Sequence, residues 1–247
     1  MPVFENKVVL VTGAAGGFGS LLAQRLADQG ARLALSDIDE AAVQGLAESL
    51  AGDVVACASD VAVEQQVADF VARAVERFGR IDVAVNNAGI SSPMKSLVET
   101  TEEDMDRNFA VNAKGVFFGM KHEIPVMLEQ GGGSILNVAS MAGIGGAPKL
   151  AAYVAAKHAV VGLTKTAAVE YARYNVRANA VCPYFSPTPL VTEGIDPAIR
   201  DRVAAASPMK RLPAPAEVVE TMLTIINPAN TYLTGQVIAI DGGVSAR

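Results

Sequence analysis

Two residues of this chain, Tyr153 and Lys157, have types and a spacing that suggest chemistry. In a helix, a separation of four places both side chains on one face, one turn apart. An ammonium beside a phenol favours the phenolate, so we expect it to lower a phenol pKa that is ordinarily about 10. Such a phenol can pass a proton near neutral pH, as ketone reduction and alcohol oxidation require. The pair alone leaves open an ordinary solvated lysine beside a half-buried ring.

A glycine-rich turn near the amino terminus indicates what such a site would use. Residues 8–11 are a continuous apolar run typical of a buried strand, and leucines recur at helical spacing over 21–26. The turn between them, 12–19, contains four glycines, which permit a tight turn and let a phosphate approach the backbone. The next helix offers free N–H groups and its positive dipole end to that phosphate. Strand, turn and helix in this order predict a dinucleotide site.

The end of the next strand indicates which dinucleotide is bound. Residues 31–36 form a mostly apolar run that ends at Asp37, eighteen residues beyond Gly19. A carboxylate at this place accepts hydrogen bonds from the adenosine ribose hydroxyls, and it repels a 2′-phosphate. Gly16 in the turn and Ile38 after the aspartate carry no charge that would hold that phosphate. The sequence therefore predicts NAD rather than NADP as the cofactor.

Apolar runs and helical patterns alternate along the whole chain. Strands are expected near residues 7–12, 31–37, 53–58, 81–86, 133–139, 176–181 and 236–240, and helices near 18–29, 39–50, 62–78, 102–129, 150–173 and 215–226. Such alternation predicts an α/β fold: a Rossmann-type doubly wound parallel sheet of about seven strands with helices on both faces. No linker is evident, so residues 1–247 are expected to form a single dinucleotide-binding and catalytic domain. Its ligands should bind beyond the carboxyl ends of the strands.

Several separated motifs resemble those of the classical short-chain dehydrogenase/reductase family, over essentially the whole chain. They are Thr12, Gly13, Gly17 and Gly19 of the turn, Asp60-Val61, Asn86-Asn87-Ala88-Gly89, the ordered set Asn112, Ser140, Tyr153 and Lys157, and the closing Thr234-Gly235 and Asp241-Gly242-Gly243. The resemblance implies cofactor contacts by Gly13, Gly16, Gly17, Phe18, Gly19, Asp37, Ile38, Asp60, Val61, Asn87, Ala88, Gly89, Tyr153, Lys157, Pro183, Tyr184 and Thr188. It also implies a homotetramer.

Four residues are expected to carry the catalysis. Tyr153 is the expected general acid/base, which protonates the carbonyl oxygen in reduction or removes the hydroxyl proton in oxidation. Ser140 ends a strand thirteen residues earlier, and its hydroxyl can hydrogen-bond the substrate oxygen and fix its position. The family resemblance adds that Lys157 binds the nicotinamide ribose. It also implies that Asn112, a poor helix former in a helical stretch, distorts its helix so that its carbonyl holds a water leading to Lys157.

The chain departs from the family pattern after the sixth strand. The family has Pro-Gly there, whereas this sequence has Pro183-Tyr184, followed by Phe185 and the expected Thr188. If the glycine adopts a conformation that other residues disfavour, the loop must differ here. Tyr184 then either lines the substrate pocket or points outwards, away from it. The pocket is expected to be apolar, under a loop over 184–214, and to be lined by Ser140, Met141, Ile144, Tyr153, Tyr184 and Phe185.

Composition argues against several other classes of protein. A net charge of −6 without a basic patch argues against nucleic acid as a partner. The amino terminus lacks the apolar core of a signal peptide, and no apolar run is long enough to span a bilayer, so no membrane is expected as a partner. The two cysteines read as reduced core residues, and the two histidines lack metal-ligand spacing, so no metal is expected. We expect a cytoplasmic protein.

Three functions fit these observations. The leading one is an NAD-dependent dehydrogenase of the short-chain type, which interconverts an apolar secondary alcohol and its ketone. The second is a reductase of 3-oxoacyl thioesters, against which Asp37 argues because biosynthetic reductases usually draw on NADPH. The third is a non-catalytic dinucleotide-binding protein. Such a protein has no evident reason to keep the whole set Asn112, Ser140, Tyr153 and Lys157.

Overall fold

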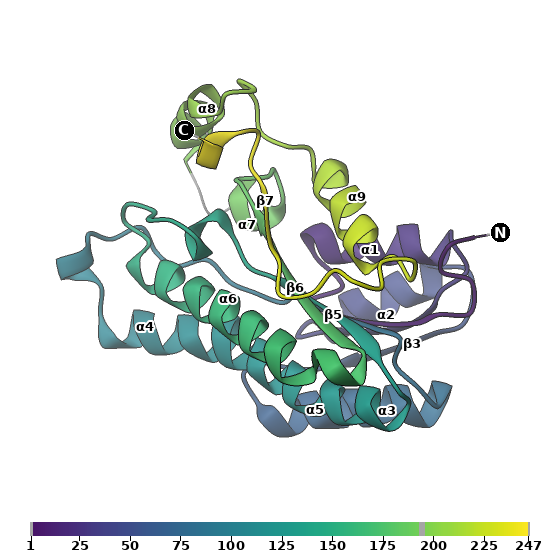
Figure 1. Ribbon diagram of the computed structural model, residues 1–247. Coiled ribbons are helices and arrows are strands. Elements are labelled where there is room, and N and C mark those ends of the chain that lie inside the picture. Colours follow the sequence, from purple (N-terminus) through teal and green to yellow (C-terminus); the bar gives the residue numbers. More distant parts are fainter. Residues whose placement is uncertain (1, 193–195, 247) are drawn as a thin grey trace.

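The computed structural model describes residues 2–192 and 196–246, and it is built around one seven-stranded parallel sheet (Figure 1). The strands follow the order β3-β2-β1-β4-β5-β6-β7 across the sheet. Their bounds are β1 Val8–Thr12, β2 Arg32–Asp37, β3 Val54–Ala58, β4 Val83–Asn86, β5 Gly133–Val138, β6 Val176–Pro183 and β7 Val237–Ile240. The chain order reverses between β1 and β4, and this reversal is where a doubly wound sheet opens a crevice for ligands.

Helices cover both faces of the sheet. Their bounds are α1 Gly17–Ala27, α2 Glu40–Ser49, α3 Glu64–Phe78, α4 Glu102–Asn108, α5 Gly115–Glu129, α6 Ala151–Tyr171, α7 Pro189–Thr192, α8 Pro197–Ala206 and α9 Pro215–Ile226. Short 3₁₀ turns occupy Leu97–Glu99, Met141–Gly143, Ala172–Tyr174 and Val244–Ala246. Helices α1, α2 and α9 pack on one face, and α3, α5 and α6 pack on the other (Figure 1). The expected fold class is confirmed.

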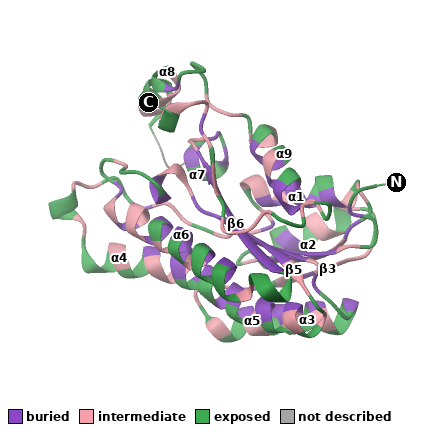
Figure 2. Cartoon of the chain, in the orientation of Figure 1, coloured by how far each residue is buried: buried purple, intermediate pink, exposed green. Residues whose placement is uncertain are grey.

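The central strands are apolar on both sides because both of their faces are covered. In β1 every residue is buried, with Val9 and Val11 in the core under α1 and α9, and Val8 and Leu10 in the core under α5 and α6. Figure 2 shows this burial along the sheet, with exposed residues on the outer sides of the helices. This rigid layer fixes where each strand ends, and so it fixes where the site residues lie.

Two expectations about the helices need correction. The stretch 102–129 is not one helix, because a π-helical turn, Phe109–Lys114, separates α4 from α5 and contains Asn112. The local distortion at Asn112 is therefore present. The loop region 184–214 contains two helices, α7 and α8, where no helix was expected, and its residues 193–195 lie outside the described residues. Within the described chain, no helix is both long and apolar enough to cross a membrane.

Candidate active site

A cavity of about 840 Å³ opens at the carboxyl ends of the strands. Residues that follow β1, β2, β3, β4, β5 and β6 all line it, and residues of α7 and α8 line one side. Every catalytic and substrate-pocket residue expected from the sequence lines this cavity, as does every expected cofactor residue except Gly19. Segments far apart in the chain thus meet in one space because parallel strands share one carboxyl edge.

The glycine turn has the geometry of a phosphate cradle. Gly13 has a φ of 62°, and a Cβ there would lie 2.7 Å from the Cα of Ala88, so a side chain is excluded. A Cβ at Gly19 would strike the carbonyl oxygen of Gly13, which explains why Gly19 is required although it does not reach the cavity. Gly16 meets nothing within 4 Å and lines the cavity. Helix α1 begins next to it without a side-chain cap, so its first N–H groups stay free for an anion.

The turn is locked to the end of β4 by Thr12 and Asn87. The hydroxyl of Thr12 accepts hydrogen bonds from the backbone N–H groups of Asn87 and Ala88, at 3.1 and 3.2 Å. The amide of Asn87 donates to the carbonyl oxygens of Thr12 and Gly13, at 3.0 and 2.9 Å. These four bonds hold both sides of the crevice at a fixed separation.

The part of the cavity at the ends of β2 and β3 has two carboxylates held by backbone N–H groups. Asp37 is half-buried and accepts from the N–H groups of Ala15 and Asp39, at 3.0 and 3.2 Å. Asp60 accepts from the N–H of Ala62 at 2.9 Å. Beside them, Ile38 is exposed and Val61 is buried. Ser59, which the sequence did not single out, also lines this end, and its Oγ is buried without a partner among the described residues.

Three of the residues expected to be catalytic, Ser140, Tyr153 and Lys157, come together where the end of β5 and the start of α6 border the cavity. The hydroxyl of Ser140 accepts from the N–H of Ala142 at 3.1 Å, and it also hydrogen-bonds the side chain of Tyr153. Lys157 is buried, and its Nζ donates to the carbonyl oxygen of Val138 at 2.8 Å. The same Nζ lies 5.7 Å from the centre of the half-buried Tyr153 ring.

The phenol pKa differs from the sequence expectation. Burial raises the pKa of Tyr153, and a hydrogen bond with the Ser140 side chain lowers it by less. Burial also lowers the pKa of Lys157 to about 8. In the cofactor-free protein burial therefore opposes the charged form of both groups. The expected lowering of the phenol pKa is wrong for this state of the protein.

Asn112 acts on the backbone through its side chain. Its Oδ1 accepts from the N–H of Ile90 at 3.0 Å, and its Nδ2 donates to the carbonyl oxygen of Ile90 at 2.9 Å. The π-helical turn places this amide against the segment that follows β4. A Cβ at Gly89 would lie 2.7 Å from Oδ1 of Asn112 and 3.4 Å from Nζ of Lys157, so only glycine fits between them. The water-holding role of the Asn112 carbonyl stays a prediction.

The part of the cavity around Tyr184 and Phe185 is largely apolar. Tyr184 lines the cavity, its hydroxyl donates to the carbonyl oxygen of Val203 at 3.1 Å, and its ring meets Phe185 edge-on at 5.3 Å. Of the described non-glycine residues, the four with positive φ do not include Tyr184, so the loop accepts a side chain where the family has glycine. The sequence missed Ile199, Arg202, Val203, Val244 and Ser245, which also line the cavity. The first three reach it from α8, and the last two reach it from the segment after β7. No local sequence pattern predicts that these two segments pack on each other.

Comparisons with known proteins agree with this geometry. A family model described as enoyl-(acyl carrier protein) reductase matches residues 13–245. The 3-oxoacyl-[acyl-carrier-protein] reductase FabG of Thermotoga maritima is 41% identical over 97% of this chain and 98% of its own length. The cyclohexanol dehydrogenase of an Acinetobacter species is 37% identical over 99% of this chain and 97% of its own length.

Solved structures also match nearly the whole length of the chain. The crystal structure of levodione reductase is 37% identical, covers 98% of this chain and 99% of its own, and superposes with a TM-score of 0.92. A 3-ketoacyl-(acyl-carrier-protein) reductase from Brucella melitensis complexed with NADH is 35% identical with a TM-score of 0.91, over 98% and 99% of the two chains. ElxO with NADP bound, 33% identical, also gives 0.91, over 98% and 100%.

Proposed function

The chain belongs to the short-chain dehydrogenase/reductase family, and on this premise we propose that it interconverts a hydrophobic secondary alcohol and its ketone with NAD. One observation supports this most: a single cavity joins the glycine turn and Asp37 at one end to Tyr153 and apolar walls at the other. The cyclohexanol dehydrogenase relative makes a cyclic alcohol a suitable first candidate.

The residues present fit a nicotinamide dinucleotide. The pyrophosphate would lie on the free N–H groups at the start of α1, where Gly13 and Gly16 leave room for it. The adenosine ribose would lie at Asp37, whose carboxylate repels a 2′-phosphate and so favours NAD. When bound, the nicotinamide supplies or accepts the hydride. The nicotinamide end would lie toward Thr188, Lys157 and Tyr153.

Tyr153 would exchange a proton with the substrate oxygen, and Ser140 would hydrogen-bond it. In reduction, the phenol gives its proton to the carbonyl oxygen, and in oxidation the phenolate takes the proton of the alcohol. The Ser140 hydroxyl, which hydrogen-bonds Tyr153 in the free protein, would turn its hydrogen to that same oxygen when the substrate binds. The oxygen is thereby held between two donors, which orients the carbon for hydride transfer.

Lys157 would supply positive charge to the phenolate. Burial of Tyr153 opposes the phenolate, whereas the Lys157 ammonium, whose Nζ lies 5.7 Å from the centre of the ring, favours it. The phenol can work as an acid/base while Lys157 stays protonated, which in the free protein is below pH about 8.

Reduction of a 3-oxoacyl thioester is the second candidate. The identity to the Thermotoga maritima reductase, 41%, favours it. Asp37 disfavours the NADPH that such biosynthetic enzymes usually use. Of the described residues that line the substrate end, Arg202 on α8 is the only cation besides Lys157, so the site offers no pair of arginines for an acidic carrier protein. Acetoacetyl coenzyme A with NADPH distinguishes this candidate from the first.

Replacement of the phenol tests the proposed function. In Tyr153→Phe we expect turnover to fall by about 10³-fold, because general acid/base catalysis is worth about 10² to 10⁴. NADH binding, followed by its fluorescence, and the melting temperature should stay unchanged. This pair of results also excludes a non-catalytic dinucleotide-binding protein. Undiminished turnover in the variant would refute the assigned chemistry.

We also propose a homotetramer. Two apolar side chains on the outer sides of the long helices support it: Phe117 on α5 is 42% exposed and Val169 on α6 is 84% exposed. Sedimentation velocity should give a mass four times that of the chain, and a monomer would contradict the proposal.

A further inference from the structure

A second cavity, of about 230 Å³, lies at the amino ends of the central strands, away from the active site. Lys7, Asp82, Ser134 and Arg177 line it, and they stand at the starts of β1, β4, β5 and β6. The end of α9 and the loop after it close the cavity from one side. Four residues along β5, roughly 13 Å, separate Ser134 from Val138 of the active-site cavity. The two cavities are therefore distinct sites.

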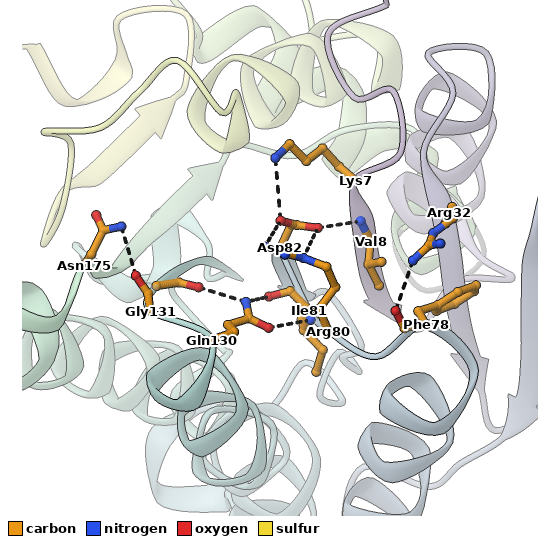
Figure 3. A network of polar contacts seen from close by, with 11 residues as sticks. Lys7, Val8, Arg32, Phe78, Arg80, Ile81, Asp82, Gln130, Gly131 and Asn175 are labelled. Atoms are coloured by element: carbon orange, nitrogen blue, oxygen red, sulfur yellow. Dashed lines mark hydrogen bonds and ion pairs between the residues drawn. The ribbon is translucent and has the colours of Figure 1, made fainter.

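The charges around this cavity are unbalanced. Lys7, Arg80 and Arg177 line it, and Asp82 is the one acidic side chain among its described lining residues. That carboxylate is already saturated (Figure 3): Arg80 donates to both of its oxygens at 2.8 and 3.1 Å, the N–H of Val8 donates at 2.9 Å, and Lys7 lies at 3.7 Å. Three cations and one acid leave a net charge of two positive units facing the cavity.

Arg177 is the least compensated of these cations. Its side chain belongs to a residue only 8% exposed, and its Nη1 donates to the carbonyl oxygen of Leu233 at 2.7 Å. In the part of the chain that the structure describes, no carboxylate forms an ion pair with it. A buried guanidinium without a counter-charge is costly, so an anion that entered the cavity would be bound favourably.

Ser134 adds an unused hydrogen-bonding group. The residue is 4% exposed, and its Oγ is buried with no partner among the described residues. It pairs in register with Arg177 across β5 and β6, so both side chains project from the same face of the sheet. A buried hydroxyl without a partner is rare in folded proteins, and rotation of this side chain toward the cavity would let a ligand oxygen satisfy it.

We propose that this cavity binds a doubly charged tetrahedral oxyanion, inorganic phosphate or the phosphate of a small phosphomonoester, between Arg177, Ser134, Lys7 and Arg80. The two excess positive charges match the charge of such a group near neutral pH. Arginine forks suit its oxygens, and the hydroxyl of Ser134 adds one further donor. The volume admits phosphate with a few waters or a short ester.

The test is isothermal titration of the protein with inorganic phosphate and, separately, with glycerol 3-phosphate. The protein is first saturated with NADH or NADPH, so that the glycine turn is filled. The variants are Arg177→Gln, Arg80→Gln and Ser134→Ala. The matched control is Ser36→Ala, because Ser36 is also a buried strand serine whose Oγ has no partner in the described chain, and it lines neither cavity.

The expected result is binding of phosphate, weakened at least about tenfold in Arg177→Gln and Arg80→Gln and about three- to tenfold in Ser134→Ala. Ser36→Ala should bind as the unchanged protein does. Tighter binding of glycerol 3-phosphate identifies the phosphomonoester as the ligand, and weaker binding identifies inorganic phosphate. If Arg177→Gln fails to fold, Arg80→Gln and Ser134→Ala decide. Absence of binding to the unchanged protein, or equal affinity in these variants and the control, would overturn the proposal.

Discussion

The buried ammonium of Lys157 lies 5.7 Å from the centre of the Tyr153 ring and is held there by a hydrogen bond to the Val138 carbonyl. Burial disfavours the charged form of each residue, since it lowers the lysine pKa to about 8 and raises that of the phenol. Burial of these two groups therefore lowers the free energy of unfolding. Such perturbed groups are typical of functional sites.

Lys157→Met should separate catalysis from stability. Turnover should fall by at least about 10²-fold because the phenolate loses its counter-charge. At pH 7 the variant should be more stable by about 1 to 2 kcal/mol, since the cost of burying a charge exceeds that of one lost hydrogen bond. Urea unfolding measures this difference, with Lys165→Met on the exposed side of α6 as the control.

The pH dependence of that difference has a defined sign. Native Lys157 loses its proton near pH 8, and the unfolded residue does so near 10.5. Between these values the unfolded state binds more protons, so the stability of the unchanged protein rises with pH. The advantage of Lys157→Met should stay constant below pH 8 and shrink above it. A variant less stable at pH 7 would contradict this picture.

Glu123 provides a second test of burial. It lies in α5, 2% exposed, and receives a hydrogen bond from Asn86 at 3.2 Å, while burial raises its pKa to about 8. Between pH 4.5 and 8 the native residue keeps its proton and the unfolded residue does not. Stability should therefore fall as pH rises through this window.

The substitution Glu123→Gln removes this loss of stability with rising pH. At pH 8 the variant should be more stable by about 1 to 3 kcal/mol, and near pH 4.5 it should equal the unchanged protein. Melting temperatures from pH 4.5 to 8 measure the effect, with the exposed Glu129→Gln on the same helix as the control. Parallel curves for the two proteins would mean that Glu123 ionises normally.

Two glycines of the turn should respond differently to the same substitution. Gly19→Ala puts a methyl group against the carbonyl of Gly13 and the amide of Asn87, and we expect it to cost about 2 to 4 kcal/mol of unfolding free energy and to weaken NADH binding. Gly16→Ala meets nothing within 4 Å and should change stability by less than about 0.5 kcal/mol. Equal losses in both variants would contradict the cradle geometry.

Asp37→Asn tests the choice of cofactor. Removal of the carboxylate removes its repulsion of a 2′-phosphate, so the ratio of kcat/KM for NADP to that for NAD should rise at least about tenfold. Asn can still accept from the N–H of Ala15, which preserves the turn. Asp28→Asn, exposed at the end of α1, is the control. An unchanged ratio would show that Asp37 does not discriminate.

The sheet was predictable from sequence because its signals are local. Val8–Thr12 and Val176–Pro183 are apolar strands bounded by turns or loops, and the observed strands begin and end within about two residues of expectation. The motif residues could be placed together because they follow strands that share one edge. Even the distortion at Asn112 carried a signal, since asparagine is a poor residue for a helix interior.

What could not be predicted depends on tertiary contacts. Helix α8 brings Arg202 and Val203 to the cavity through a loop whose packing no short pattern encodes. The phenol pKa was misjudged because a spacing of four shows proximity to Lys157 but not the burial of either group. Likewise, the burial of Arg177 beside an unpartnered Ser134 follows from strand register alone.

The most direct test of the proposed function is the nicotinamide absorbance on mixing the protein with NAD or NADP and a panel of alcohols. The panel should contain linear, cyclic, aryl-substituted and steroid secondary alcohols together with 3-hydroxyacyl thioesters. We predict turnover with NAD and an apolar, preferably cyclic, secondary alcohol. Turnover confined to NADP and a 3-hydroxyacyl thioester would contradict it.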